Sequence, residues 1–230
     1  MRYLVVFFFF YKKVDKMRYL VVCGGKIDKE FGLNEIKTDG IDAIIAADSG
    51  MDFLYENGVT PDIIVGDFDS ATTKALEFFE RKGQTEIHRL NPIKDDTDTE
   101  YAIRLAIREG ARSIVVLGAT GSRIDHVLGN ISLLGIGLES KTDISIIDTN
   151  NRIRMADKPV TIEKSAQYGR FVSLIAVTDD NEVSLKGFKY PVTDYSFDRF
   201  TSLGISNEIV DDHALIDIHR GKFIIIESKD

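Results

Sequence analysis

The sequence predicts an α/β protein with an N-terminal parallel sheet, covered by helices on both faces, and a C-terminal antiparallel β-sandwich. Up to Asp148, strand-like apolar runs alternate with amphipathic helical runs, which is typical of parallel strands joined by helical crossovers. After Asn150 the helical periodicity disappears, and short apolar runs separated by turns recur. The length of 230 residues allows two domains, and 43% hydrophobic residues is ordinary for a globular protein.

Charge and cysteine content exclude several kinds of site. The formal net charge is −8 and no basic patch is found, so we expect no nucleic-acid partner. The single Cys23 rules out an internal disulfide and a zinc site built from several thiolates. Because Cys23 ends an apolar run, we expect it to be a buried structural thiol.

The N-terminus repeats itself, since MRYLVV occurs at residues 1–6 and again at 17–22. The apolar stretch from Tyr3 to Tyr11 is shorter than the ~20 residues that a membrane-spanning helix needs, and no signal cleavage site follows it. We therefore interpret residues 1–16 as an N-terminal extension outside the fold, from an upstream start or a duplication. We expect a cytoplasmic protein without a membrane partner.

The N-terminal elements follow in order. Residues 19–23 form an apolar run that ends at two glycines, and residues 42–48 form a second strand. A helix over 51–58 comes next, and a glycine and a proline mark its end. The next strand is the apolar run 63–65, which leads into Gly66. The remaining predicted elements are a helix from about 72 to 82, a strand over 85–90, a helix over 97–110, a strand over 113–118, a helix from about 124 to 138 and a strand over 143–148.

The C-terminal part is predicted to contain strands alone. Turn residues interrupt the apolar runs at Asp157–Pro159, Asp179–Asn181 and Arg220–Gly221. The predicted strands cover residues 152–156, 160–163, 170–177, 182–188, 207–219 and 222–227. The change in pattern places a domain boundary near 148–152, which gives domains at 17–149 and 150–230.

Acidic residues follow several of the parallel strands. Asp48 ends one strand, and Asp67 and Asp69 follow the next. Ligands bind beyond the carboxyl ends of strands in such sheets. Two carboxylates this close repel each other unless a cation or strong donors separate them, and Mg²⁺ prefers carboxylate oxygens together with phosphates. The pair therefore predicts a magnesium site.

A further acidic cluster, Asp95, Asp96 and Asp98, precedes the helix at 97–110. Asp is also a favoured helix N-cap, so capping remains an equally good interpretation for each of these three residues taken alone.

A glycine-containing loop predicts a phosphate partner. Gly118 and Gly121 lie between a strand and a helix, where backbone N–H groups meet anionic oxygens, and Arg123 adds a forked cation. The loop lacks the Walker pattern, so this is not a P-loop enzyme.

Four motifs occur in order: PDIIVGDFDS, KDDTDTEYAI, LGATGSRIDHVLGNI and SLGISNE. Together they resemble the thiamine pyrophosphokinase family in its bacterial form, and the resemblance covers nearly all of 17–230. It implies a Rossmann-like nucleotide-binding domain, a β-rich thiamine-binding domain and a homodimer with active sites at the interface. The implied reaction transfers the diphosphate of ATP to the hydroxyl of thiamine and yields thiamine diphosphate and AMP.

The resemblance also implies roles for individual residues. Asp67, Asp69 and Asp98 would hold Mg²⁺ and act in catalysis. The nucleotide would lie beside six residues: Asp48, Asp95, Thr97, Gly118, Gly121 and Arg123. Asp125 would face thiamine and orient or deprotonate its alcohol. Tyr190, Ser206 and Asn207 would contact thiamine, the last two across the dimer interface.

The sequence departs from the family pattern in two places. Ser49 stands where a glycine is expected, which could alter the approach of the backbone to the nucleotide, and tryptophan is absent. His126 lies in a family motif but is equally explained as a structural residue, and the other histidines receive no role.

Three other functions fit part of the sequence pattern. A phosphatase of the haloacid dehalogenase type would use Asp67 as nucleophile, but the later acidic and lysine motifs that it needs are missing from the sequence. A sugar-nucleotide transferase would use an Asp-x-Asp metal site. A non-catalytic thiamine or nucleotide sensor would not need the complete set of acidic residues.

Overall fold

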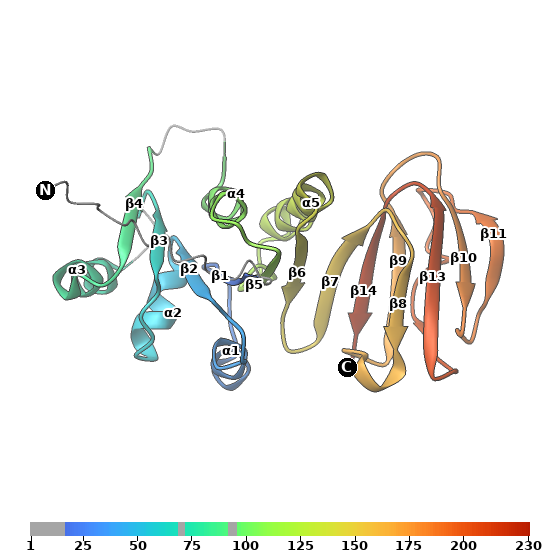
Figure 1. The fold of residues 1–230 in the computed structure, drawn as a ribbon, viewed down its shortest axis with the longest axis horizontal. Helices are drawn as coiled ribbons and strands as arrows, with labels where there is room; N and C mark the ends of the chain where they lie inside the picture. The colour runs from blue at the N-terminus through green and yellow to red at the C-terminus, as the bar shows by residue number, and fades with distance from the viewer. Residues whose placement is uncertain (1–16, 69–71, 92–95) are drawn as a thin grey trace, which may run out of the picture.

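The computed structural model describes residues 17–68, 72–91 and 96–230. Their strands form two sheets: a ten-stranded sheet in the order β12-β9-β14-β7-β6-β5-β1-β2-β3-β4, and a four-stranded sheet in the order β11-β10-β13-β8 (Figure 1). The result is a mixed α/β fold with a large mixed sheet and a separate antiparallel sheet.

The N-terminal half of the large sheet is parallel. Its strands are β1 (Arg18–Val22), β2 (Ala43–Ala47), β3 (Ile63–Gly66), β4 (Glu86–Arg89), β5 (Ser113–Leu117) and β6 (Asp143–Ile147). Its helices are α1 (Lys29–Ile36), α2 (Gly50–Glu56), α3 (Thr73–Lys82), α4 (Asp98–Arg108) and α5 (Ile124–Ser140). β1 pairs in parallel with both β2 and β5. The alternation predicted from the sequence is therefore confirmed for these strands.

The two faces of this sheet carry different helices. Tyr19, Val21 and Cys23 point into a core shared with α4 and α5, whereas Leu20 and Val22 point into a core shared with α1, α2 and α3. This alternation follows from the two-residue period of a strand. Figure 1 shows α4 and α5 on one side of the sheet and α1 and α2 on the other. Both cores exclude water from β1, which is why that strand reads as a continuous apolar run.

The first helix was not predicted. α1 starts after Asp28, whose carboxylate accepts a hydrogen bond from the backbone N–H of Phe31 at 2.9 Å. Gly32 interrupts the apolar pattern of α1, but a Cβ there would lie 2.7 Å from the Phe53 ring. Close packing on α2 therefore requires a glycine at this position, and the same glycine is the reason why the sequence pattern does not indicate a helix.

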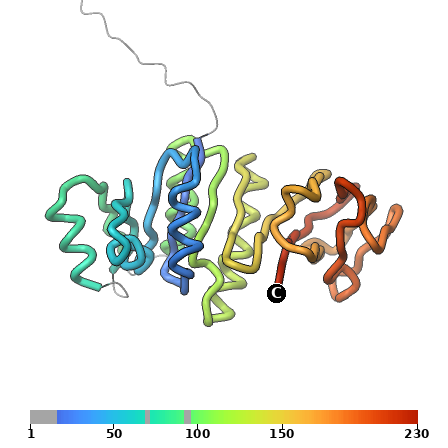
Figure 2. The backbone as a smooth tube through the Cα atoms, turned by 90° about the horizontal axis from the view of Figure 1, so that it is seen from below, coloured from blue at the N-terminus to red at the C-terminus, as the bar shows by residue number. Residues whose placement is uncertain are grey.

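The C-terminal half continues the same sheet. β7 (Asn151–Ala156) pairs antiparallel with β6, and β14 (Phe223–Ser228) lies between β7 and β9 (Phe171–Ala176). β12 (Asn207–Glu208) pairs with β9 at the edge. The predicted boundary near 148–152 falls in the turn between β6 and β7, within one hydrogen-bonded sheet. Figure 2 shows the C-terminus at this junction between the halves.

The second sheet covers these antiparallel strands. It contains β8 (Val160–Glu163), β10 (Glu182–Lys186), β11 (Val192–Ser196) and β13 (His213–Arg220), and the short helix η1 (Lys164–Ala166) follows β8. Buried residues of β9 and β14 pack with residues of β8, β10 and β13 in one apolar core. The sequence predicted most of these strands but missed β11, and it read β12 and β13 as one run.

A buried carboxylate joins two strands of the large sheet. The Glu227 side chain on β14 is fully buried and accepts hydrogen bonds from Arg152 and Arg154 on β7. It also accepts one from the backbone N–H of Tyr168 at 2.9 Å. Burial lowers the pKa of the Arg154 guanidinium, and the nearby Glu227 opposes this shift.

Within the described residues, no helix is long and apolar enough to cross a membrane.

Candidate functional site

The site lies where the parallel strands end. β1 and β5 are neighbours, but the chain leaves them for helices on opposite faces of the sheet. A crevice forms beyond the strand ends at such a point, and ligands bind there in open α/β sheets. Two loops border it, one from β1 to α1 and one from β5 to α5. The loops after β2 and β3 and the start of α4 complete one side.

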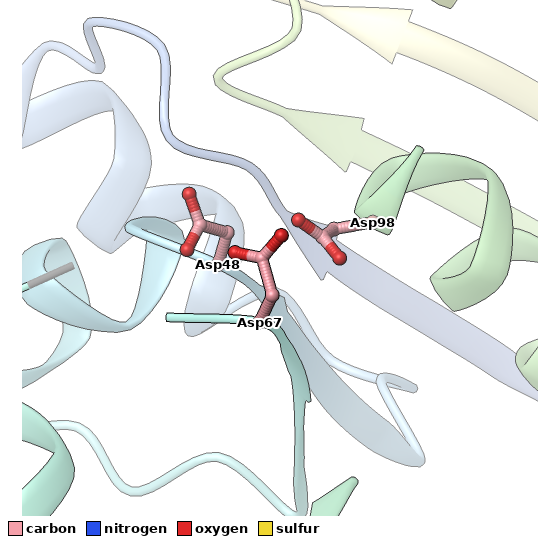
Figure 3. A group of neighbouring side chains, drawn as sticks. All are labelled: Asp48, Asp67 and Asp98. Atoms are coloured by element: carbon pink, nitrogen blue, oxygen red, sulfur yellow. The ribbon is translucent and has the colours of Figure 1, made fainter. Parts of the chain in front are cut away.

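Three carboxylates meet at this edge. One oxygen from each of Asp48, Asp67 and Asp98 can be chosen so that all three lie within 4.8 Å of one another. Figure 3 shows their side chains turned toward one another from the ends of β2 and β3 and from the start of α4. All three residues are partly buried. Like charges this close favour a cation between them.

The backbone around these residues explains how they converge. Asp48 adopts the left-handed conformation, with φ 47°, while its N–H still donates to Val65 O at 2.8 Å. A non-glycine residue in this region is uncommon, and strain of this kind concentrates at functional sites. Phe68, directly after Asp67, is also left-handed, with φ 65°.

At the start of α4, one residue caps the helix and another belongs to the acidic cluster. Thr97, not an aspartate, is the N-cap, and its hydroxyl accepts a hydrogen bond from the Glu100 N–H at 3.2 Å. Asp98 is the first helical residue, and its carboxylate belongs to the acidic cluster. The capping interpretation therefore does not account for Asp98.

The observed cluster contains two members of the predicted metal set together with Asp48. Sequence reasoning assigned Asp67, Asp69 and Asp98 to the metal and Asp48 to the nucleotide, whereas the structure brings Asp48 together with Asp67 and Asp98. The position of Asp48 at the end of a neighbouring parallel strand was the signal that could have placed it in this cluster. Asp69 and Asp95 lie outside the described residues.

A cavity of about 620 Å³, which we call the phosphate cavity, opens beside the cluster. Its walls include Asp48, Asp67 and Asp98, together with glycines of both loops and residues of α5. Among these lining residues are Gly24, Gly25, Thr97, Gly118, Gly121, Arg123, His126 and Asn130. The carboxylates on one wall suit a cation. The backbone N–H groups and the arginine on the other wall suit an anionic ligand bound to that cation.

The two loops touch at their glycines. Gly25 N–H donates to Gly118 O at 2.9 Å, and a Cβ on Gly25 would lie 2.2 Å from that oxygen. Gly118 has φ 69°, and a Cβ there would lie 2.4 Å from Cys23 O. A side chain fits at neither position, so only backbone atoms lie where the two loops touch.

Ser49 fits the position where a glycine was expected. Its φ is −63°, which any residue adopts, and it is the N-cap of α2. The position expected of a Cβ on Gly24 lies 2.0 Å from Ser49 Oγ, so the serine side chain occupies the space left by that glycine. The departure from the family pattern therefore adds no backbone strain at residue 49.

The β5–α5 loop is anchored from both sides. The Asn130 side-chain amide donates to Ala119 O at 2.9 Å, and the Thr120 hydroxyl donates to an Asp148 oxygen at 2.7 Å. Asp148 also accepts from the backbone N–H groups of Asn150 and Asn151, both at 2.8 Å. The loop is therefore held by α5 and by the β6–β7 turn. Sequence reasoning missed Asn130 and Asp148.

Asp125 lies apart from the cavity walls. Its carboxylate is 64% exposed and forms a salt bridge with Arg123 at 2.5 Å. The hydrogen bond from Arg123 lowers the pKa of Asp125 to about 2. Its neighbour His126 lines the phosphate cavity instead.

Cys23 is a buried thiol, as predicted, with 4% exposure. Burial raises its pKa to about 11, although the Thr99 hydroxyl donates to its sulfur at 3.4 Å and opposes this shift. A thiol that stays protonated near neutral pH is a poor nucleophile.

The residues expected at thiamine lie at the other end of the sheet. The Asn207 side chain on β12 accepts from the Tyr190 N–H at 3.0 Å and donates to the Tyr190 carbonyl at 2.9 Å. Ser206 is left-handed, with φ 60°, and the Tyr190 side chain is exposed. The three residues form one group. Seven strand spacings separate β12 from β2, which ends beside Asp48, and this corresponds to ~34 Å.

Comparisons with known proteins agree with this architecture. The family models described as "Thiamin pyrophosphokinase, catalytic domain" and "Thiamin pyrophosphokinase, vitamin B1 binding domain" match residues 37–147 and 159–223. The chain is 35% identical over 188 residues to a thiamine pyrophosphokinase of Bacillus subtilis, covering 81% of this chain and 87% of the relative.

Solved structures give the same result. A thiamine pyrophosphokinase structure from Bacillus subtilis superposes with a TM-score of 0.83 at 30% identity, covering 93% of this chain and 99% of that one. One from Geobacillus thermodenitrificans has a TM-score of 0.80 at 28% identity, covering 93% and 98% of the two chains. The yeast enzyme, at 18% identity and a TM-score of 0.76 over 93% and 87% of the chains, shares the fold.

Proposed function

The chain belongs to the thiamine pyrophosphokinase family and has the function of that family, and on this premise we propose how its residues divide the reaction among them. The diphosphate of ATP is transferred to the hydroxyl of thiamine, which gives thiamine diphosphate and AMP. The single observation that carries the assignment of the reaction centre is the convergence of Asp48, Asp67 and Asp98 beside an anion-binding loop.

The cluster fits Mg²⁺. Its ligand atoms are carboxylate oxygens within 4.8 Å of one another, and hard cations with oxygen ligands at ~2.1 Å accept such a set. Asp48, Asp67 and Asp98 would hold the ion, and Asp69 stays a predicted further ligand. When bound, the ion neutralises charge on the transferred phosphates.

The opposite wall binds the phosphates. Backbone N–H groups at the start of α5 and the dipole of this 17-residue helix favour anions. Arg123 and the glycines Gly118 and Gly121 line the same wall. Thr97, which lines the cavity, and Asp95 stay predicted neighbours of the nucleotide. These groups position the diphosphate and stabilise its charge, so no covalent intermediate with the protein is needed.

Asp125 acts on the acceptor side as an orienting group. Its low pKa makes it a weak base at neutral pH, so it fixes Arg123 and the thiamine hydroxyl rather than removing a proton. His126, on the cavity wall, is a second group within this region.

The thiamine contacts come from a second subunit. Tyr190, Ser206 and Asn207 lie ~34 Å along the sheet from the cluster of their own chain. Exposed apolar side chains mark both regions: Ile124 and Leu128 on α5 are 67% and 61% exposed, and Leu203 and Phe200 near Ser206 are 60% and 91% exposed. Such patches commonly mark interfaces. A homodimer that joins them would complete each site with residues of both chains.

The domain roles follow from this division. Residues 17–149 would form the Rossmann-like ATP-binding domain and residues 150–230 the thiamine-binding domain, with 1–16 outside both. The cytoplasmic location stays a prediction. Membership of the family disfavours the phosphatase, the sugar-nucleotide transferase and the sensor.

One assay tests the proposal. The purified protein is incubated with ATP, Mg²⁺ and thiamine, and AMP and thiamine diphosphate are quantified together. We expect equal amounts of both products, and none when the metal is removed with a chelator. Release of inorganic phosphate without thiamine diphosphate would instead indicate a phosphatase.

A further inference from the structure

Asp148 lies where two neighbouring parallel strands end, outside the acidic cluster. It directly follows β6, which pairs in parallel with β5. The β5–α5 loop, residues 118–123, therefore starts beside it. In that loop the Thr120 hydroxyl donates a hydrogen bond to one oxygen of the Asp148 carboxylate at 2.7 Å. Asp148 has no part in the reaction proposed above.

The turn that follows Asp148 holds its carboxylate in one orientation. The other carboxylate oxygen accepts hydrogen bonds from the backbone N–H groups of Asn150 and Asn151, both at 2.8 Å. It also accepts one from the Asn151 side-chain amide at 3.0 Å. The turn therefore sets the direction in which the carboxylate presents its remaining oxygen to Thr120.

The main chain of Asp148 is held from the C-terminal half of the fold. The Tyr168 hydroxyl donates a hydrogen bond to the Asp148 carbonyl. Burial raises the pKa of this hydroxyl, which therefore remains a donor across the neutral range. The Tyr168 backbone N–H donates to the buried Glu227 carboxylate at 2.9 Å. A connected series of hydrogen bonds thus runs from β14 through Tyr168 and Asp148 to the β5–α5 loop.

The β5–α5 loop depends on such an anchor because it contains glycines. Gly118 is left-handed, with φ 69°, and glycine loses more conformational freedom on folding than any other residue. Thr120 lies between Ala119 and Gly121, which both line the phosphate cavity. Thr120 itself lines a different cavity, of about 420 Å³, which Asp148 also lines. The Thr120 hydroxyl therefore affects the phosphate cavity through the main chain on either side of it.

We infer that Asp148 is a positioning residue of the reaction. Through the Thr120 hydroxyl it holds residues 119–121 of the β5–α5 loop at the transferred phosphates, and Tyr168 holds Asp148 in turn. This inference rests on the proposed function, because the β5–α5 loop is taken to bind those phosphates. Small displacements of groups that position a reacting centre lower the rate strongly. The C-terminal half of each chain thus serves the phosphate side of its own site, in addition to the thiamine contacts proposed for it.

Thr120→Val is the first variant to measure, because valine keeps the shape of threonine and removes only the hydroxyl. We expect kcat/KM for ATP to fall about tenfold while the KM for thiamine stays within about twofold. Thr120→Ser keeps the hydroxyl and should restore the wild-type value. Tyr168→Phe, which removes the hydrogen bond to the Asp148 carbonyl, should lower kcat/KM for ATP about threefold. Thermal melting checks that each variant is folded.

Inorganic tripolyphosphate separates positioning from a direct contact between Thr120 and a ligand in the 420 Å³ cavity. It carries phosphates but no nucleoside, and titration calorimetry with Mg²⁺ gives its Kd for the full-length protein. Thr120→Val should weaken its binding about fivefold.

Thr149→Val is the matched control. Thr149 lines the same 420 Å³ cavity, but its hydroxyl donates to the Asn150 side chain at 2.7 Å. This variant should keep both kcat/KM for ATP and the Kd for tripolyphosphate within about twofold of the wild type.

A double-mutant cycle tests whether Thr120 acts through Asp148. Asp148→Ala alone should lower kcat/KM for ATP at least as much as Thr120→Val does. Adding Thr120→Val to Asp148→Ala should then change the value by less than about twofold, because the two residues form one contact. Two independent losses that multiply would show that Thr120 does not act through Asp148.

Three further outcomes overturn the inference: an unchanged kcat/KM for ATP in Thr120→Val, an equal loss in Thr149→Val, or an unchanged Kd for tripolyphosphate in Thr120→Val. The absence of tripolyphosphate binding by the wild type also overturns it, because the loop would then not hold phosphates by itself. Failure of the proposed function looks different, since the wild type would then form no thiamine diphosphate from ATP and thiamine, whatever its affinity for tripolyphosphate.

Discussion

At the scale of single residues, the carboxylates of the candidate site lie in two different environments. Asp48, Asp67 and Asp98 share one small volume, whereas Asp125 is exposed and paired with Arg123. All four residues are visible in the sequence, but only the fold shows which of them meet. Sequence proximity grouped Asp67 with Asp69, and strand adjacency grouped Asp67 with Asp48.

The strained Asp48 is the first residue to test. Asp48→Asn removes one charge from the cluster but keeps the size of the side chain, and asparagine tolerates the left-handed conformation. We expect turnover to fall ~10²-fold or more and the Mg²⁺ concentration for half-maximal rate to rise. Steady-state kinetics at several metal concentrations measures both. Asp179→Asn, at a carboxylate that is 89% exposed, is the control. A wild-type rate for Asp48→Asn at limiting metal would remove Asp48 from the metal site.

Asp125 gives a prediction about pH. Arg123 lowers its pKa to about 2 in the folded protein, so the carboxylate stays ionised as pH rises from that value, and its interaction is lost only as pH falls through about 2. From about pH 5 to 9 the kcat profile should therefore contain no inflection due to Asp125. The Asp125→Asn variant should be slower, with a profile of unchanged shape. If an inflection near neutral pH disappears in the variant, Asp125 is the base after all.

At the scale of elements, the sequence locates the strands and helices whose hydrophobic pattern is regular. The strands β1, β2, β3, β5 and β6 are apolar runs bounded by glycine or acids, and the sequence locates them. α1 was missed because Gly32 breaks its apolar pattern in order to pack on Phe53. The pairing of β6 with β7 could not be predicted, because no local pattern distinguishes a turn within a sheet from a boundary between domains.

The β5–α5 loop depends on its anchor from α5. Asn130→Ala removes the hydrogen bond to Ala119 O, and a bond of this kind contributes about 1 kcal/mol. We expect the KM for ATP to rise about fivefold while the KM for thiamine stays constant. Ser132→Ala on the same helix, which removes a hydroxyl that donates to Leu128 O, should change neither value. Equal increases in both KM values would show general loosening instead of a loop effect.

The β7–β14 pair depends on the buried Glu227. Glu227→Gln leaves Arg152 and Arg154 without their carboxylate, and breaking a buried ion pair costs about 3–5 kcal/mol. Urea denaturation should show a loss of that size in the free energy of unfolding. Asp180→Asn, which breaks an exposed pair with Arg220, should cost less than about 1 kcal/mol. A similar small loss in both variants would show that Glu227 is not needed to hold these strands together.

At the scale of the whole molecule, the two groups of proposed site residues lie ~34 Å apart along the sheet, which is too far for them to meet within one chain. The proposed homodimer therefore predicts complementation between two defective variants. Asp67→Asn impairs the metal side, and the double variant Tyr190→Ala/Ser206→Ala impairs the thiamine side. Each should be nearly inactive alone as a symmetric dimer.

Equal amounts of the two variants, mixed under conditions that exchange subunits, should regain about a quarter of the wild-type rate, because a quarter of the sites then combine two intact sides. Mass measurement in solution confirms exchange. Mixing Asp67→Asn with Asp48→Asn, both on the metal side, should restore nothing. If the first mixture recovers no activity although subunit exchange is proven, the two groups of residues do not complete one site between two subunits.

The place of β14 has a consequence for how the protein is made. β14 follows every other described strand in the sequence, yet it lies between β7 and β9 in the large sheet. On the ribosome, β7 and β9 must therefore wait as open edges until the last strand has been synthesised. Open edges recruit other chains, and charged side chains on them discourage this. Arg152 and Arg154 are charged side chains of this kind on β7, and Glu227 on β14 forms ion pairs with both once the strand is in place.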